Sequence, residues 1–241
     1  MTARELIELE SLAENPYPML HRLRSTTPIA RARSAGGHMW LVTRRADVLE
    51  ILRNPEHFST DHPASPIRDT FGAQMLSAEG EAQRRFKSAC SLPFNRRAVD
   101  VNAEPIVRAR LEQLLDAIEG RSDELVDLRA TLAAPLALAV VSDVIGIPAA
   151  MHDLVREWYD AFAAALATHD PSSAARRQGR NSAAAFRAAV APLIAQSSTG
   201  THDALLGHLA HAAPSSRLDD AEILANTLIV LFGGIETTEA A

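Results

Sequence analysis

The sequence predicts a mainly α-helical protein with a small β element near its N-terminus, and two observations support this prediction. Residues 28–33 and 38–43 alternate apolar and polar side chains on either side of the pair Gly36-Gly37, which is the pattern of a β-hairpin. From residue 80 onward the chain is rich in alanine, and its apolar residues recur at helical spacing. We therefore expect a hairpin near the start and helices over most of the remainder.

Turn and capping residues divide the chain into its expected elements. Short helices are predicted at 19–26 and 47–52, on either side of the hairpin. Residues 61–78 are rich in Pro, Gly, Ser and Asp without a sustained period, which predicts a long loop of the kind that helps to shape a binding pocket. Longer helices are predicted at 80–92, 104–119, 127–145, 150–167, 174–196, 202–211 and 218–241. The breaks between them are Gly120, Gly146 with Pro148, Asp170-Pro171, Gly200 and Pro214.

Composition limits the function classes. The chain has 241 residues, of which 47% are hydrophobic and 22% charged, so it can build a core of its own. The net charge of -6 argues against a nucleic-acid partner, because phosphate binding needs a basic surface. No basic leader precedes an apolar run at the start, and uncharged stretches such as 130–142 are too short to cross a bilayer. With one cysteine and no predicted membrane span, we expect a cytoplasmic protein.

The last predicted helix contains residues that are costly in a helix. Gly233 and Gly234 each cost about 1 kcal/mol relative to alanine, and threonines follow them. A glycine lets a flat or bulky group approach the backbone, and a threonine hydroxyl can bond to a carbonyl of the preceding turn. Glu236 beside Thr237 adds a short path for protons. The alternative is a helix C-terminus that frays, with Glu236 as a solvated charge, and these features alone leave both open.

The segment Gly233-Gly-Ile-Glu-Thr-Thr238 resembles the oxygen-activating motif [AG]-G-x-[DE]-T-[TS] in the central helix of cytochromes P450. The resemblance implies that Gly233 and Gly234 lie against a haem b. It implies that Glu236 and Thr237 are the catalytic acid–alcohol pair that delivers protons during oxygen activation. The apolar turn before them would line the substrate pocket, through Ile229, Val230 and Phe232.

Further phrases extend the resemblance over essentially the whole chain. They are Asn15-Pro-Tyr-Pro18, Trp40-Leu-Val-Thr-Arg44, Leu52-Arg-Asn-Pro55, His57-Phe-Ser59 and Phe94-Asn-Arg-Arg97. Residues 1–241 are accordingly expected to form a single, partial cytochrome P450 domain of the bacterial soluble type, an incomplete version of that fold.

The sequence also departs from the family pattern. Where the family carries His-x-x-x-Arg to grip a haem propionate, alignment on Phe94 places Gln83 and Lys87. Lys87 can offer a cation, but as a point charge rather than a planar fork, so weaker propionate binding is expected. Alternatively, Gln83 and Lys87 are ordinary surface residues. The chain ends at Ala241, before the expected cysteine segment, so no axial ligand is assigned; Cys90 lies elsewhere and is expected to be a small buried residue.

Three functions remain open. The first is a haem-thiolate monooxygenase that hydroxylates or epoxidises an apolar small molecule with electrons from a ferredoxin-type partner, expected to be inactive as this truncated chain. The second is a haem-free helper protein, for example for a glycosyltransferase. The third is a truncated gene product without a function of its own. A last helix with an apolar belt is expected to need a protein partner to cover it. His208 and His211, with Asp203 nearby, form a weak candidate metal site.

Overall fold

The computed structural model describes residues 6–62, 65–120, 125–197, 204–212 and 217–239. A three-stranded sheet lies near the N-terminus, with the parallel pair β1–β2 and the antiparallel pair β2–β3. The strands are β1 (Leu6–Glu8), β2 (Ile29–Ser34) and β3 (Gly37–Val42). The hairpin prediction is confirmed, with Ile29 opposite Val42 and Ser34 opposite Gly37. Strand β1 was not predicted.

Helices make up the rest of the described chain, as expected. Near the sheet they are α1 (Tyr17–Thr26) and α2 (Arg45–Leu52), and next along the chain come α3 (Pro66–Phe71) and α4 (Gly80–Ser91). The body contains α5 (Arg96–Ala98), α6 (Glu104–Glu119), α7 (Ala134–Ile145), α8 (His152–Ala167), α9 (Ala174–Ser197), α10 (Leu205–Ala210) and α11 (Asp220–Glu239). Single turns of 3-10 helix lie at Leu9–Leu12, Leu92–Phe94 and Ala149–Met151, and π-helical turns at Val99–Ala103 and Arg129–Ala133.

The expected long loop at 61–78 is wrong in one respect, because α3 lies within it. Ser65 caps this helix by accepting a hydrogen bond from the Arg68 amide, and Pro66 occupies its first position, where no amide is needed. Phe71 is fully buried at its end. The loop is therefore anchored to the body by a short capped helix. The predicted breaks at Gly200 and Pro214 lie outside the described residues.

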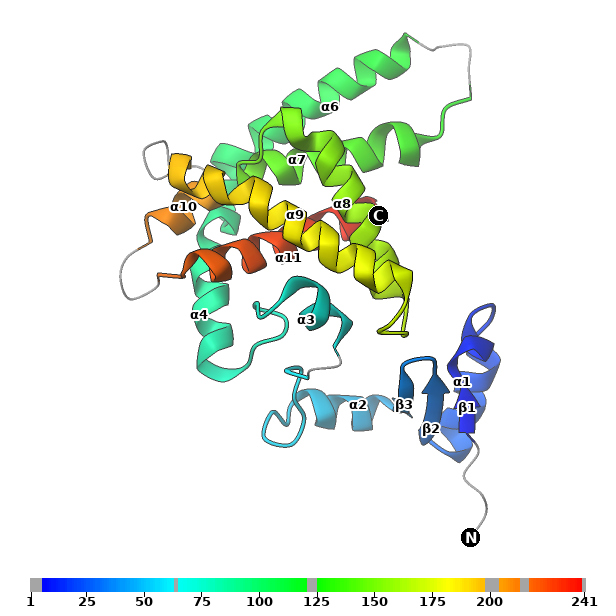
Figure 1. Ribbon diagram of the computed structural model, residues 1–241. Coiled ribbons are helices and arrows are strands. Elements are labelled where there is room, and N and C mark those ends of the chain that lie inside the picture. Colours follow the sequence, from blue (N-terminus) through cyan, green and yellow to red (C-terminus); the bar gives the residue numbers. More distant parts are fainter. Residues whose placement is uncertain (1–5, 63–64, 121–124, 198–203, 213–216, 240–241) are drawn as a thin grey trace.

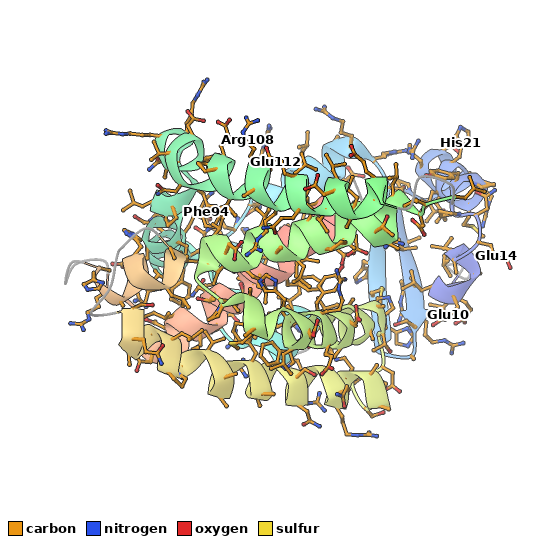
Figure 2. All side chains as sticks on the ribbon, turned by 90° about the horizontal axis from the view of Figure 1, so that it is seen from above. Glu10, Glu14, His21, Phe94, Arg108 and Glu112 are labelled. Carbon is orange, nitrogen blue, oxygen red and sulfur yellow. The ribbon has the colours of Figure 1, made fainter. Side chains whose placement is uncertain are left out.

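The helical body is built in layers around α11. Figure 2 shows α6, α7, α8 and α9 following one another across the body, with Arg108 and Glu112 on the outer side of α6. Helix α11 packs against both α7 and α9, and the sheet with α1 and α2 lies to one side of the body (Figure 1). The main hydrophobic core joins α4, α7, α8, α9, α10 and α11, and a smaller cluster of Ile7, Leu23, Ala30 and Ala32 lies beneath the sheet. The expectation of a single domain stays a prediction.

Two glycines allow close packing or a sharp turn in this body. Gly36, in the hairpin turn, lies so near the His169 carbonyl that a Cβ at this position would overlap its oxygen. The hairpin turn therefore touches the connection between α8 and α9. Gly146 ends α7 in the left-handed conformation, with φ of 97°, as expected for a glycine C-cap.

Helix α11 is the central helix of the body. By length and composition it could span a membrane, but half of that stretch is buried inside the protein, and the core helix of a soluble protein passes the same test. Among the described residues of α11, the side chains from Ile223 to Ile229, with Leu231 and Ile235, are buried, while Val230 and Phe232 remain partly exposed. Helices α7 and α9, with α3, α4 and α10, pack against α11 and cover the buried part of its apolar belt.

Candidate functional site

Helix α11 begins with a capping box. The Asp219 carboxylate accepts a hydrogen bond from the Glu222 amide at 2.8 Å, and the Asp219 amide donates to Glu222 Oε2 at 3.0 Å. Arg85 of α4 donates to the same carboxylate from both Nη atoms, with Nη1–Oε2 at 2.9 Å. Glu222 thus fixes the start of α11 and fastens α4 to it.

The ion pair of Arg85 with Glu222 predicts an acid-sensitive stability. The Arg85 hydrogen bond holds the pKa of Glu222 below its ordinary value. A carboxyl group with a lowered folded-state pKa stabilises the fold above its unfolded pKa, and this stability is lost as the pH falls through the folded value. We therefore expect the urea midpoint of the protein to fall as the pH is lowered from about 5 to about 3, and to fall less in Glu222→Gln. The exposed Glu112→Gln is the matched control and should keep the full decrease; an equal decrease in all three proteins would contradict the assignment.

The glycine pair does not interrupt α11. The helix continues through Gly233 and Gly234 to Glu239, and the Thr237 hydroxyl donates to the Gly233 carbonyl at 2.9 Å. The bond from a threonine to the preceding turn is the one expected from the sequence. The reading of this segment as a frayed helix end therefore finds no support in the structure.

The two glycines face different surroundings. A Cβ built on Gly233 would meet nothing within 4 Å, so the backbone there is open to an approaching group. A Cβ built on Gly234 would lie 2.6 Å from Cγ2 of Val141, so this glycine lets α11 and α7 approach closely. One glycine thus leaves an exposed backbone surface, and its neighbour serves helix packing.

This difference predicts opposite effects of alanine. Gly233→Ala should raise the free energy of unfolding by up to about 1 kcal/mol, because alanine favours a helix and nothing is displaced. Gly234→Ala gains the same propensity but must displace Val141, and overpacking of this kind costs about 1–3 kcal/mol. Urea denaturation of the two variants measures the difference. Similar unfolding free energies for both would contradict the described packing.

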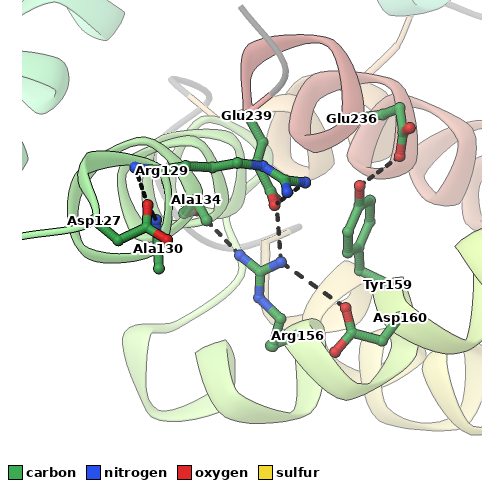
Figure 3. Close-up of polar contacts among 9 residues, drawn as sticks. All are labelled: Asp127, Arg129, Ala130, Ala134, Arg156, Tyr159, Asp160, Glu236 and Glu239. Carbon is green, nitrogen blue, oxygen red and sulfur yellow. Dashed lines mark hydrogen bonds and ion pairs between the residues drawn. The ribbon is translucent and has the colours of Figure 1, made fainter.

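Glu236 and Thr237 lie on the exposed part of α11. Figure 3 shows the Tyr159 hydroxyl of α8 pointing at Glu236, and this hydroxyl donates to Oε2 of the carboxylate. Among the described residues, Oε1 of Glu236 has no hydrogen-bond partner. The acid and the alcohol are therefore adjacent in sequence, exposed, and one turn beyond the open backbone of Gly233.

The three apolar residues assigned to a substrate pocket lie before this turn. Ile229 is buried in the main core, and Val230 and Phe232 pack against that core while remaining partly exposed. The Phe232 ring lies 5.6 Å from Phe71 and 5.7 Å from Tyr159, measured between centroids. Their place in a substrate pocket stays a prediction.

An apolar cavity of about 290 Å³ lies beside α11, with Gly234 in its lining. It is bounded by α7, by α11 and by the segment from Pro93 to Val107. The lining residues are Pro93, Phe94, Val99, Ala103, Val107, Leu136, Ala137, Val140, Val141, Val144, Gly234 and Thr238. Several of these residues, including Phe94 and Val99, are large apolar side chains that remain exposed. The cavity and its rim therefore form an exposed apolar surface next to α11.

Helix α4 carries the two residues that were assigned to a haem propionate. Gln83 is half-buried and Lys87 is exposed, and neither side chain has a hydrogen bond or ion pair within the described part of the chain. The Arg85–Glu222 pair places α4 beside the first turn of α11. At a rise of 1.5 Å per residue, Gly233 lies about 16 Å further along α11. Their role towards a propionate stays a prediction.

Cys90 is a buried residue, as expected. It is 3% exposed, and burial raises the pKa of its thiol to about 11. The thiol therefore remains protonated at neutral pH and behaves as a small buried apolar group. In the described residues no three or more His, Cys, Asp or Glu side chains are grouped to hold a metal ion, and Asp203 lies outside them.

Sequence reasoning missed the hydrogen-bond partners of Glu236 and of the nearby Glu239. Tyr159 belongs to an amphipathic helix in which an aromatic residue is expected to pack in the core, and nothing in the sequence relates it to Glu236. Arg156 and Arg129 were missed as well; both donate to Glu239, at 3.2 and 3.1 Å (Figure 3). The packing of α8 and of the π-helical turn Arg129–Ala133 against α11 brings these side chains together.

Comparisons with known proteins show what the chain as a whole resembles. No protein-family model matches the chain. It is 29% identical to the cytochrome P450 monooxygenase PikC of Streptomyces venezuelae over 237 residues, which cover 95% of this chain and 55% of that protein. It is 30% identical to a methyl-branched lipid omega-hydroxylase of Mycobacterium tuberculosis, over 86% of this chain and 49% of that protein. The chain thus spans about half the length of the curated relatives it matches.

Solved structures show the same fold. The cytochrome P450 PksS of Bacillus subtilis matches with a TM-score of 0.77 and 26% identity, over 93% of this chain and 56% of that chain. P450BioI, solved in complex with an acyl carrier protein bearing hexadec-9Z-enoic acid, matches with a TM-score of 0.81 and 21% identity, over 96% and 60%. The predicted mainly α fold with a small N-terminal sheet is confirmed. In sequence and in fold, nearly the whole chain matches part of a bacterial cytochrome P450.

Proposed function

We propose that this chain forms the oxygen-activating helix and the substrate side of a haem-thiolate monooxygenase. The observation that carries the proposal is the open backbone of Gly233, one turn before an exposed acid–alcohol pair. A glycine at an exposed helix position lowers the stability of the helix relative to alanine. Close approach of a flat cofactor to the bare backbone would explain why glycine is present there.

The residues of this chain are compatible with one side of a haem b. Gly233 offers a surface without a side chain, and we assign Gly233 and Gly234 to the cofactor face, with Gly233 as the open position. Lys87, which is exposed and has no ion pair among the described residues, is assigned to a propionate with Gln83 beside it. Cys90 is not assigned as the axial ligand, because its side chain is buried in the main hydrophobic core. A bound haem supplies the dioxygen and one-electron chemistry that no side chain provides.

The chain's own part in the reaction is to hold and move protons. Because the Thr237 hydroxyl donates to the Gly233 carbonyl, its oxygen keeps lone pairs that accept a hydrogen bond from solvent or from an acid. Glu236 has one oxygen engaged by Tyr159 and leaves Oε1 for proton exchange. This acid–alcohol pair would act as a general acid at the cofactor face.

Substrate and partners follow from the same assignment. The partly exposed Val230 and Phe232, with Ile229 behind them, favour an apolar small molecule, which would be hydroxylated or epoxidised. The relatives are bacterial enzymes that include a lipid hydroxylase, which supports this substrate class. We propose a ferredoxin-type protein as the electron donor and the cytoplasm as the location.

A carbon-monoxide spectrum tests the proposal. Protein that contains this chain together with the haem-binding part of a cytochrome P450 should show a Soret band, and that band should shift when the reduced protein meets carbon monoxide. A folded protein that takes up no haem under these conditions would refute the monooxygenase assignment.

A second candidate function is a haem-free helper subunit, for example for a glycosyltransferase. It is favoured by the uncharged Gln83 at the propionate position and by the exposed apolar residues around the cavity of α7 and α11. Omitting the chain from a reconstituted reaction tests this candidate. A helper is indicated if the glycosyltransferase loses activity without the chain, and an unchanged rate would exclude it.

A further inference from the structure

The Tyr159 hydroxyl is the one group on α8 that reaches the carboxylate of Glu236, within the residues that the structure describes. Tyr159 is 8% exposed, whereas Glu236 is exposed. A buried tyrosine hydroxyl needs a hydrogen-bond partner, and Oε2 of Glu236 provides it. The bond therefore joins a fixed, buried donor to a long side chain that would otherwise sample several rotamers in solvent.

Neighbouring contacts hold the tyrosine ring in place. Its centroid lies 5.7 Å from the Phe232 ring, and the Arg156 guanidinium carbon lies 5.3 Å over it. Arg156 is anchored in turn, because it donates to Glu239 at 3.2 Å and to the Ala134 carbonyl at 3.1 Å (Figure 3). The position of the hydroxyl is thus set by α7, α8 and α11 together.

Tyr159 acts as a neutral donor. Burial, together with the bond to Glu236, raises the pKa of Tyr159 above its ordinary value, so the phenol keeps its proton throughout the neutral range. The phenol is therefore able to orient the carboxylate without itself exchanging protons at neutral pH.

We propose that Tyr159 is a positioning residue that holds Oε2 of Glu236 against α8, so that Oε1 is the oxygen that exchanges protons beside Thr237. This inference rests on the proposed function, which gives Glu236 protons to deliver. It assigns the two oxygens of one carboxylate to different tasks, one to fixation and the other to proton transfer.

A double-mutant cycle on this chain tests the fixation. Tyr159→Phe removes only the hydroxyl, and Glu236→Leu removes its acceptor, which a glutamine would not do because its amide oxygen can still accept the bond. We expect each substitution to lower the thermal midpoint, and the double variant to lower it by less than the sum of the two. Tyr17→Phe, which changes an exposed tyrosine, is the matched control and should leave the midpoint unchanged. Additive shifts would overturn the proposal.

A kinetic cycle of Tyr159→Phe with Glu236→Gln, in the haem-loaded protein, tests the positioning role. We expect Tyr159→Phe to lower kcat by about 10-fold with KM unchanged, because one hydrogen bond to a charged group is lost. In the Glu236→Gln background Tyr159→Phe should have no further effect on kcat, since there is no acid left to position. An equal decrease in both backgrounds would mean a merely structural role and would overturn the inference. Absence of a Soret band would refute the proposed function instead, while the stability cycle would still decide whether Tyr159 fixes Glu236.

Discussion

Replacement of Glu236 by glutamine is expected to lower kcat of the haem-loaded protein by roughly 10²–10⁴-fold, the usual contribution of a general acid or base. Glutamine keeps the size of the side chain and can still accept the Tyr159 hydrogen bond, but it delivers no proton. The loss should therefore appear in kcat rather than in substrate binding, because Glu236 does not belong to the apolar surface formed by Val230 and Phe232.

Steady-state kinetics with a matched control checks this expectation. Glu157, exposed on the neighbouring helix α8, also carries a carboxylate but has no contact with the acid–alcohol pair in the described residues. Glu157→Gln should leave kcat within about twofold of the parent, an effect of under 0.5 kcal/mol on the barrier. Equal losses in the two variants, or a Glu236→Gln variant with normal kcat, would contradict the role given to Glu236.

Replacement of Phe71 by alanine is expected to cost about 3–5 kcal/mol of unfolding free energy, the range for truncating a buried phenylalanine. Phe71 is fully buried at the end of α3, 5.1 Å from the Phe162 ring in an edge-on arrangement and 5.6 Å from Phe232. Alanine would leave a cavity between α3, α8 and α11. The segment over α11 would lose its anchor, although the Met75 amide still donates to Asn226 at 3.0 Å.

Urea denaturation measures this cost. Leu76, from the same segment, is 56% exposed, and Leu76→Ala should change the unfolding free energy by no more than about 0.5 kcal/mol. A loss of less than 1 kcal/mol in Phe71→Ala would show that α3 does not pack on the body as described.

Local patterns in the sequence were enough to predict the hairpin and the main helices. Alternation around Gly36-Gly37 predicts the pairing of β2 with β3, and helical spacing with glycine stops predicts α6 to α9. Strand β1 could not be predicted, because three residues carry too little periodicity and their partner, β2, lies more than twenty residues further along. Helix α3 was missed because its six residues lie in a segment dominated by turn-forming residue types. Tertiary packing of Phe71 stabilises it.

The candidate site was predictable only where its residues are adjacent in sequence. Gly233, Glu236 and Thr237 fall within five positions, so spacing and the family motif identify them together. The different surroundings of Gly233 and Gly234 depend on Val141 of α7, almost a hundred residues away, and no local pattern carries that information. Tyr159 was missed for the same reason, because its link to Glu236 exists only in the folded protein.

The central claim is that the open backbone at Gly233 is the surface on which a haem lies, and the Soret absorbance of a Gly233→Leu variant tests it most directly. Leucine is a far better helix former than glycine, so the variant should gain about 0.5–1 kcal/mol of unfolding free energy. Ala221→Leu, at an exposed position of the same helix, is the control and should bind haem normally. We predict that Gly233→Leu folds, is at least as stable as the parent, and shows no Soret band. A Soret band of parental strength in Gly233→Leu would contradict the account.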